Sequence, residues 1–239
     1  MISLRKQQEE IAMFSSNAGK AIFFVRKLLS EIAKAGYYNA SDDMDVVGAD
    51  DIVILAERMM DAQDEFIQAG KPFHVDLGYH YTLESNIERI RTDGLLTKKE
   101  RREKSVNVRN TGSFFGDGIY TSDNPFSFCN FGNMGLVVAR LQGRVLRVAR
   151  YDARNQSEYD RYDTLVGNKT GTFDKCSKDE IVLKTCAQAL PLLWYPTELI
   201  HYQTNIDLPI TKYNKILQDV VNEFFNTPIA SAIAKQEFF

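Results

Sequence analysis

The hydrophobic periodicity of the chain changes near residue 73, and this change restricts the possible folds more than any other feature. Before it, apolar residues recur at helical spacing over residues 21–35 and about 50–69, with a weaker helical pattern at 4–14. After it, short apolar runs with β-branched residues predict strands at 73–81, 136–141, 144–149, 180–184 and 192–201. A final amphipathic helix is expected at about 210–225. Helices at both ends of irregularly spaced strands indicate an α+β fold rather than a series of βαβ units.

The same change divides the chain into an N-terminal helical region, residues 1–72, and a larger domain, residues 73–239. Thr82 is expected to cap a short helix at 83–92, and Gly94 is expected to end that helix in the left-handed conformation. Residues 98–104 are basic and are expected to form a solvated loop.

Composition excludes several classes of protein. The chain is 44% hydrophobic and 26% charged, as in ordinary globular proteins, and its net charge of −3 argues against a general nucleic-acid coat. The longest apolar runs, 21–25 and 189–195, are far below the roughly 20 residues that span a bilayer, and no secretory signal pattern is found. Three cysteines without a C-x-x-C spacing argue against disulfides and a zinc site. We expect an intracellular protein, cytoplasmic or nuclear, without a metal.

Three segments carry residues of chemical interest. His80 is one of only three histidines and lies at the end of a predicted strand, although a lone histidine is more often structural than catalytic. The segment 114–120 has two glycines framed by aromatic residues, which would let the backbone approach a flat ligand closely. Glu180 opens an apolar run, and a carboxylate there is costly to bury unless it has a partner or a task. An exposed carboxylate at a sheet edge is the simpler explanation of Glu180.

Taken in order, these segments resemble the catalytic domain of the PARP family, the diphtheria-toxin-like ADP-ribosyltransferases, over about residues 73–203. The first three similar motifs are His80-Tyr81-Thr82 for H-G-[ST], Asp93-Gly94-Leu95 for E-G-L, and Phe115-Gly116-Asp117-Gly118-Ile119-Tyr120 for F-G-x-G-I-Y. The last two are Tyr162-Asp163-Thr164-Leu165-Val166-Gly167 for Y-D-S-V-V-G, and Glu180-Ile181-Val182 followed by Gln188 and Pro191. Each motif is weak alone, and the shared order makes the resemblance specific.

The resemblance implies an ADP-ribosyltransferase fold, with a split and mainly antiparallel β-sheet core preceded by a small helical region. It also implies NAD as a co-substrate. His80, Tyr120 and Glu180 would be the catalytic residues. His80 would bind a hydroxyl of the adenosine ribose, Tyr120 would stack on nicotinamide, and Glu180 would bind the 2′-hydroxyl of the nicotinamide ribose. The implied NAD-binding residues are His80, Tyr81, Thr82, Gly116, Gly118, Tyr120, Ser127 and Phe131.

Two departures from the family pattern concern the nicotinamide pocket. Tyr81 replaces the glycine of H-G-[ST], and its ring would either point away or narrow the pocket. Phe128 stands where the family often has a serine, although Ser127 is adjacent.

The expected function is transfer of ADP-ribose from NAD to a macromolecular acceptor, with release of nicotinamide. A protein side chain is favoured as acceptor over a nucleic acid, and mono- over poly-ADP-ribosylation. Within the basic segment 98–104, a Lys or Arg could contact the pyrophosphate of NAD. The alternative is a catalytically inactive PARP-like module that binds ADP-ribose or a partner.

Overall fold

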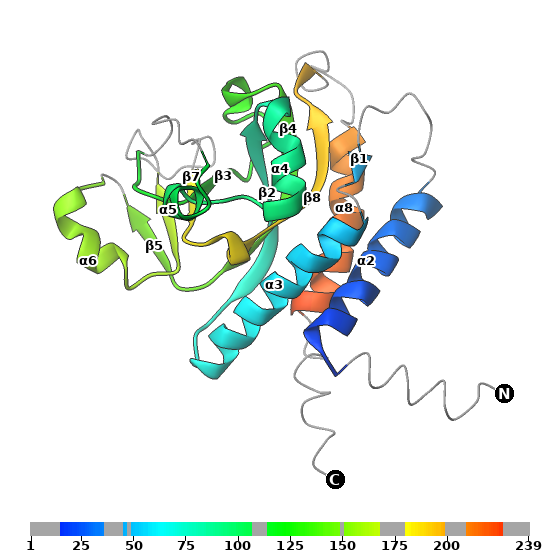
Figure 1. The fold of residues 1–239 in the computed structure, drawn as a ribbon, viewed down its shortest axis with the longest axis horizontal. Helices are drawn as coiled ribbons and strands as arrows, with labels where there is room; N and C mark the ends of the chain where they lie inside the picture. The colour runs from blue at the N-terminus through cyan, green and yellow to red at the C-terminus, as the bar shows by residue number, and fades with distance from the viewer. Residues whose placement is uncertain are drawn as a thin grey trace, which may run out of the picture.

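The computed structural model describes residues 15–35, 45–46, 49–106, 114–148, 151–167, 180–198 and 209–226. The predicted helix at 4–14 and His201 lie outside these ranges. Two four-stranded sheets, mostly antiparallel, lie beside one another, with the long helices gathered on one of them (Figure 1). The expectation of an α+β fold with a split, mainly antiparallel sheet is therefore confirmed.

The first sheet holds the long strands in the order β1-β8-β4-β2, and every pair in it is antiparallel. Its strands are β1 (Asp45–Val46), β8 (Ala189–Pro196), β4 (Met134–Gln142) and β2 (His74–Thr82). β2 pairs with β4 along its whole length, from His74 opposite Gln142 to Thr82 opposite Met134. β8 begins earlier than the predicted strand, because the apolar run that starts at Ala189 pairs with β4 throughout.

Three helices pack on the first sheet and share one hydrophobic core with it. They are α2 (Asn17–Lys34), α3 (Ala49–Gln68) and α8 (Pro209–Val221), the last continuing into the π-helical turn η5 (Asn222–Asn226). α2 contacts both α3 and α8, α3 contacts β8, and α8 contacts β2. Phe24, Leu28, Met59, Leu193 and Leu217 are all buried in this core. The N-terminal helices are therefore part of the packing of the first sheet.

The second sheet is built from short strands in the order β3-β7-β6-β5. These are β3 (Ile119–Thr121), β7 (Glu180–Leu183), β6 (Thr164–Gly167) and β5 (Val145–Val148), with β5 and β6 parallel and the other pairs antiparallel. β6 was not among the strands predicted from the sequence, whereas the equally short β5 and β7 were. The remaining short elements are η2 (Cys129–Phe131), η3 (Ala153–Asn155), α6 (Gln156–Tyr159) and η4 (Cys186–Gln188).

The segment after β2 differs in detail from the sequence prediction. It forms η1 (Glu84–Asn86), α4 (Ile87–Asp93) and α5 (Lys98–Glu103). Gly94 ends α4 with a positive φ of 77°, but its ψ of −173° lies outside the left-handed helical region that was expected. The predicted cap at Thr82 is wrong, since Thr82 is the last residue of β2 and its Oγ1 accepts a hydrogen bond from the Asn86 side chain.

The basic segment expected to be a loop is the helix α5. Thr97 and Glu100 form a capping box at its start, with the Thr97 side chain accepting from the Glu100 backbone and the Glu100 carboxylate accepting from the Thr97 backbone. The capping box marks the start of a helix, so the expectation of a loop is wrong. Among the helices of the described ranges, none is long and apolar enough to cross a membrane.

Candidate active site

A cavity of about 870 Å³ lies where the two sheets meet. Its walls come from the ends of β2, β3 and β7, from α4 and α5, and from the turn at η2. Seven of the residues proposed from the sequence line it: His80, Tyr81, Thr82, Gly118, Tyr120, Phe131 and Glu180. Gly116 and Ser127 are not among the lining residues. The three proposed catalytic residues therefore share one cavity although 100 residues separate the first from the last.

The imidazole of His80 is held by the backbone of the neighbouring sheet. Its Nδ1 lies 2.7 Å from the carbonyl oxygen of Tyr120. Because a carbonyl oxygen only accepts, Nδ1 carries the proton and Nε2 is left as an acceptor in the neutral ring. Burial lowers the pKa of His80 below its ordinary value, and the positive charge of Arg101 adds to that shift, while the bond to the Tyr120 carbonyl opposes it. A neutral His80 can accept a hydrogen bond from a ligand hydroxyl.

The hydroxyl of Tyr120 is fully engaged by the turn that precedes β3. It accepts from the backbone N–H of Phe115 at 2.9 Å and donates to the carbonyl of Gly116 at 2.7 Å. Burial raises the pKa of Tyr120, and the negative charge of Glu180 raises it further, so the phenol remains protonated. Since both ends of the ring are fixed, Tyr120 offers the cavity a flat and rigid aromatic surface.

The two glycines of the motif before Tyr120 have structural tasks. Gly116 adopts φ +85° and has the Tyr151 hydroxyl 2.8 Å from the place where a Cβ would stand. A Cβ at Gly118 would lie 2.3 Å from Cγ1 of Val182 and 2.7 Å from the carbonyl oxygen of Leu183. Gly116 therefore shapes the turn that binds the Tyr120 hydroxyl, and Gly118 lets β3 approach β7 closely. The close approach brings Tyr120 beside the strand that begins with Glu180.

Glu180 is only 5% exposed and lines the cavity at the first position of β7. It pairs with Gly167 of β6, and the next residue, Ile181, pairs with Thr121 of β3. The Thr121 hydroxyl also donates to the Ile181 carbonyl at 3.0 Å. The simpler explanation, an exposed edge carboxylate, is therefore wrong, and the backbone around Glu180 is fixed from both neighbouring strands.

The side chain of Tyr81 lies in the core of the first sheet. Successive residues of a strand point to opposite faces, so the Tyr81 ring is on the other face of β2 from His80. Its hydroxyl donates to the Pro125 carbonyl and lies 3.2 Å from the Tyr195 hydroxyl. Gly135 makes this contact possible, because a Cβ there would stand 2.3 Å from the Tyr195 ring. Of the two outcomes considered for Tyr81, the ring pointing away is the one observed.

The residues near the predicted nicotinamide grip are arranged differently from the expectation. Ser127 is 1% exposed, and its hydroxyl has no hydrogen-bond partner among the described residues. Phe128 adopts φ 64° and lines the cavity together with Phe131. The two rings meet edge to face, with centroids 5.9 Å apart, and Phe131 is 51% exposed. An aromatic pair, rather than a serine hydroxyl, therefore forms this part of the wall.

Helix α5 places the positive charge of Arg101 at the cavity. The sequence indicated this residue only as one of the basic residues at 98–104. Arg101 lines the cavity, and its Nε is buried without a hydrogen-bond partner among the described residues. The helix is held in place by Asp117, whose carboxylate accepts from the backbone N–H groups of Lys98 and Lys99 at 2.7 and 2.9 Å. Glu100 accepts from the backbone of Cys186 at 2.9 Å. Arg101 is thus presented by a fixed helix.

Within the described ranges, no group of three or more His, Cys, Asp or Glu side chains could hold a metal ion.

Comparison with known proteins gives a similarity of fold only. The chain matches no protein-family model and no curated protein. Among solved structures it is similar to the PARP domain of Arabidopsis RADICAL-INDUCED CELL DEATH1, at 15% sequence identity and a TM-score of 0.47. The match covers 71% of this chain and 93% of that one. At that level of similarity it assigns no role to any residue of this chain.

Proposed function

We propose that this chain transfers ADP-ribose from NAD to a macromolecular acceptor and releases nicotinamide. The observation that carries the proposal is the convergence of His80, Tyr120 and Glu180, from three strands, on one cavity. The volume of about 870 Å³ lies within the range of roughly 300–1,000 Å³ that ligand pockets occupy. A protein side chain is the proposed acceptor, and a single ADP-ribose is the proposed product.

The reaction needs a site that stabilises positive charge on a ribose. The bond between C1′ and the nicotinamide nitrogen breaks, and its electron pair leaves with nicotinamide, which becomes neutral. An oxygen or nitrogen of the acceptor then bonds to C1′ and loses its proton. Between these events the ribose resembles an oxocarbenium ion, as in glycoside hydrolysis. A buried carboxylate that accepts from the 2′-hydroxyl, the task proposed for Glu180, favours that charge electrostatically.

The other residues would bind and orient NAD. His80 Nε2 would accept a hydrogen bond from a hydroxyl of the adenosine ribose, because Nδ1 already donates to Tyr120. The fixed ring of Tyr120 would stack on nicotinamide, which is worth about 0.5–1.5 kcal/mol beyond the area that it buries. Arg101 would contact the pyrophosphate, since its positive charge suits an anionic group and its buried Nε has no hydrogen-bond partner within the described part of the chain.

The first experiment measures nicotinamide release from NAD by the wild type and by Glu180→Gln. The amide keeps the shape of the side chain and removes its charge, so release should fall about 10²- to 10³-fold. Glu158→Gln is the matched control, because Glu158 is an exposed carboxylate on α6 and its loss should leave release unchanged. Equal release by the wild type and Glu180→Gln would refute the role of Glu180.

The same experiment separates the enzyme from a catalytically inactive binding module. A folded wild type that releases no nicotinamide, even with added protein or nucleic acid, would overturn the proposed transfer in favour of that module. With NAD labelled in its adenine ring, label on protein supports the proposed acceptor, and label on nucleic acid overturns it. A ladder of product sizes would contradict transfer of a single unit. The short segment 168–179 would form the acceptor side of the site, and its length favours a single unit over a growing chain. It lies outside the described residues.

A further inference from the structure

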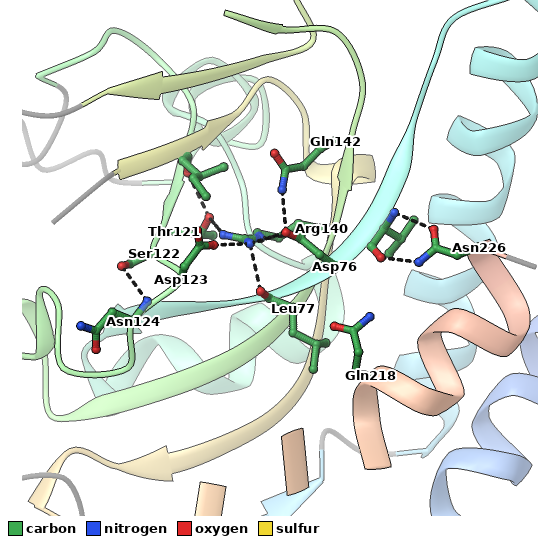
Figure 2. A network of polar contacts seen from close by, with 12 residues as sticks. Asp76, Leu77, Thr121, Ser122, Asp123, Asn124, Arg140, Gln142, Gln218 and Asn226 are labelled. Atoms are coloured by element: carbon green, nitrogen blue, oxygen red, sulfur yellow. Dashed lines mark hydrogen bonds and ion pairs between the residues drawn. The ribbon is translucent and has the colours of Figure 1, made fainter. Parts of the chain in front are cut away.

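Arg140 of β4 is a fully buried charge at the place where the two sheets meet (Figure 2). Its side chain is 0% exposed. The guanidinium binds the carboxylate of Asp76 on β2 through two hydrogen bonds, at 2.9 and 2.7 Å. It also donates to the Asp123 carboxylate at 2.6 Å, to the Leu77 carbonyl at 2.9 Å and to the Thr121 hydroxyl at 3.3 Å. The guanidinium therefore contacts β2 on one side and the end of β3 on the other.

The cluster is built to keep Arg140 charged. Burial alone would lower the pKa of Arg140, but the carboxylates of Asp76 and Asp123 outweigh it and raise the pKa. The Asp76 carboxylate also accepts from the Gln142 amide at 2.8 Å, so both of its oxygens are engaged. Loss of Asp76, which makes two of these hydrogen bonds, would leave only the exposed Asp123 to compensate the buried charge, which is unfavourable.

Gly78 of β2 provides the space through which the side chain passes. A Cβ at this position would lie 2.5–2.6 Å from three atoms of the Arg140 guanidinium group. The missing side chain thus lets Arg140 cross the face of β2 and reach the second sheet. The Arg140 side chain therefore occupies the space that a side chain at position 78 would fill.

The residues that Arg140 binds are adjacent to those proposed to contact NAD. Thr121 follows Tyr120 directly, and its hydroxyl donates to the Ile181 carbonyl next to Glu180. Beside Asp123, Ser122 and Tyr79 exchange two backbone hydrogen bonds, at 2.8 and 2.9 Å, which join β3 to β2 one residue before His80. One guanidinium therefore ties together the backbones that carry His80, Tyr120 and Glu180.

We propose that Arg140 is a positioning residue, which sets the separation of His80 from Tyr120 and Glu180 across the junction of the two sheets. The inference rests on the proposed NAD reaction and goes beyond it, since Arg140 does not line the cavity. A site that spans NAD from its adenosine ribose to its nicotinamide ribose needs both ends at a fixed distance. A displacement of about 1 Å in such a site can cost about 100-fold in rate.

The test uses three variants in the full chain. Arg140→Met removes the charge, Arg140→Lys keeps the charge without the planar fork, and Asp123→Asn weakens one contact of a side chain that is 69% exposed. Asp219→Asn is the control, because Asp219 is an exposed residue of α8. The first readout is amide hydrogen exchange at Tyr79 and Ser122, compared with Val137 and Leu193 in the core of the first sheet. This readout does not require activity.

The second readout is nicotinamide release, resolved into kcat and KM. We expect kcat/KM to fall about 10- to 100-fold in Arg140→Met. The decrease should be smaller in Arg140→Lys and in Asp123→Asn. A reduced folded fraction lowers kcat alone, whereas a shifted site also raises the KM for NAD. Exchange should accelerate at Tyr79 and Ser122 before it changes at Val137 and Leu193.

Unchanged exchange at Tyr79 and Ser122, with an unchanged KM for NAD, in folded Arg140→Met would overturn the positioning role. If Arg140→Met does not fold, the same result in Asp123→Asn overturns it. A wild type without nicotinamide release would refute the proposed function, while faster exchange at Tyr79 and Ser122 would still support the link between the two sheets.

Discussion

The two sheets of this protein are stabilised in different ways. The first has three strands of eight or nine residues beside the two-residue β1, and three helices cover it with one continuous apolar core. The second has strands of three and four residues, and its buried apolar residues fall into two smaller clusters, one of which it shares with Leu136 and Val138 of β4. The large core tolerates small shifts because its attraction is not directional, whereas short strands with little apolar area depend on individual polar contacts.

Several polar contacts that hold the second sheet involve residues outside its four strands. The Gln188 amide donates to the carbonyls of Leu141 and Asp163, both at 3.0 Å, and so joins β4 to the residue that precedes β6. Lys71 binds the Asp163 carboxylate at 2.7 Å, and Asp117 binds the start of α5. The comparison teaches that the first sheet supplies stability, while the polar contacts at the junction set the geometry of the site.

The largest effect is expected in the core of the first sheet. Leu28→Ala should lower the free energy of unfolding by about 3–5 kcal/mol, because the Leu28 side chain of α2 is fully buried in the large core. Leu165→Ala in the second sheet should cost about 2–3 kcal/mol, because a small cluster can collapse further around the lost atoms. Urea unfolding measures both values. A larger loss for Leu165→Ala would reverse the comparison.

Gly118→Ala should destabilise the protein by about 1–3 kcal/mol, because the new methyl group meets Val182 and the backbone of Leu183. It should also reduce nicotinamide release more than its loss of stability explains, since β3 must move away from β7. Gly70→Ala is the control, because a Cβ there meets nothing within 4 Å and only the φ of +62° is strained. Equal release by both variants, at equal folded fraction, would show that the approach of β3 to β7 does not matter for the site.

Asp117→Ala removes the carboxylate that holds the start of α5 beside the second sheet, and leaves the core of the first sheet unchanged. Removing the carboxylate frees the first N–H groups of α5, a change that typically costs about 0.5–2 kcal/mol. Hydrogen exchange at Lys98 and Lys99 should accelerate, while exchange in α2 and α3 stays as in the wild type. Acceleration that extends into α2 would mean that the two regions unfold together and are less distinct than their packing suggests.

The smallest effect is a pH dependence from His80. Because burial lowers its pKa in the folded protein, the unfolded chain binds a proton at a pH where folded His80 does not. Stability should therefore decrease as the pH falls below the ordinary value of 6.5, by at most about 1.4 kcal/mol per pH unit. The difference between wild type and His80→Asn in urea unfolding, followed from pH 7.5 to 5.5, isolates this contribution. A difference that stays constant over this range would contradict a neutral His80 in the folded protein.

The elements that the sequence predicted best are those with a long periodic pattern. The patterns at 21–35 and 50–69 gave α2 and α3 to within a few residues, and the strands β2, β4 and β7 were placed equally well. β6 was missed, although β5 and β7 are equally short and were predicted. The helix α5 was missed because its six residues are all charged and show no apolar face that would indicate a helix.

The candidate site divides in the same way. The order of the motifs predicted that His80, Tyr120 and Glu180 belong together, and the cavity contains all three. The sequence could not tell where the Tyr81 ring points, because that depends on the space over Gly135. Gly135 lies opposite Tyr81 on β4 but 54 residues later in the chain. Ser127 does not line the cavity and Arg101 does. Both results depend on how the segment before η2 and the helix α5 pack against the strands, which the sequence does not show.

The sequence by itself therefore determined the long helices and strands, their order, and the identity of the residues proposed for chemistry, because periodicity and motif spacing are local properties. Only the tertiary structure decided how the two sheets meet. Arg140 lies 64 residues from Asp76 and 17 from Asp123, and its path exists only because Gly78 leaves it open. Such a contact depends on three-dimensional proximity and on the cost of burying a charge, and no local pattern in the chain encodes either.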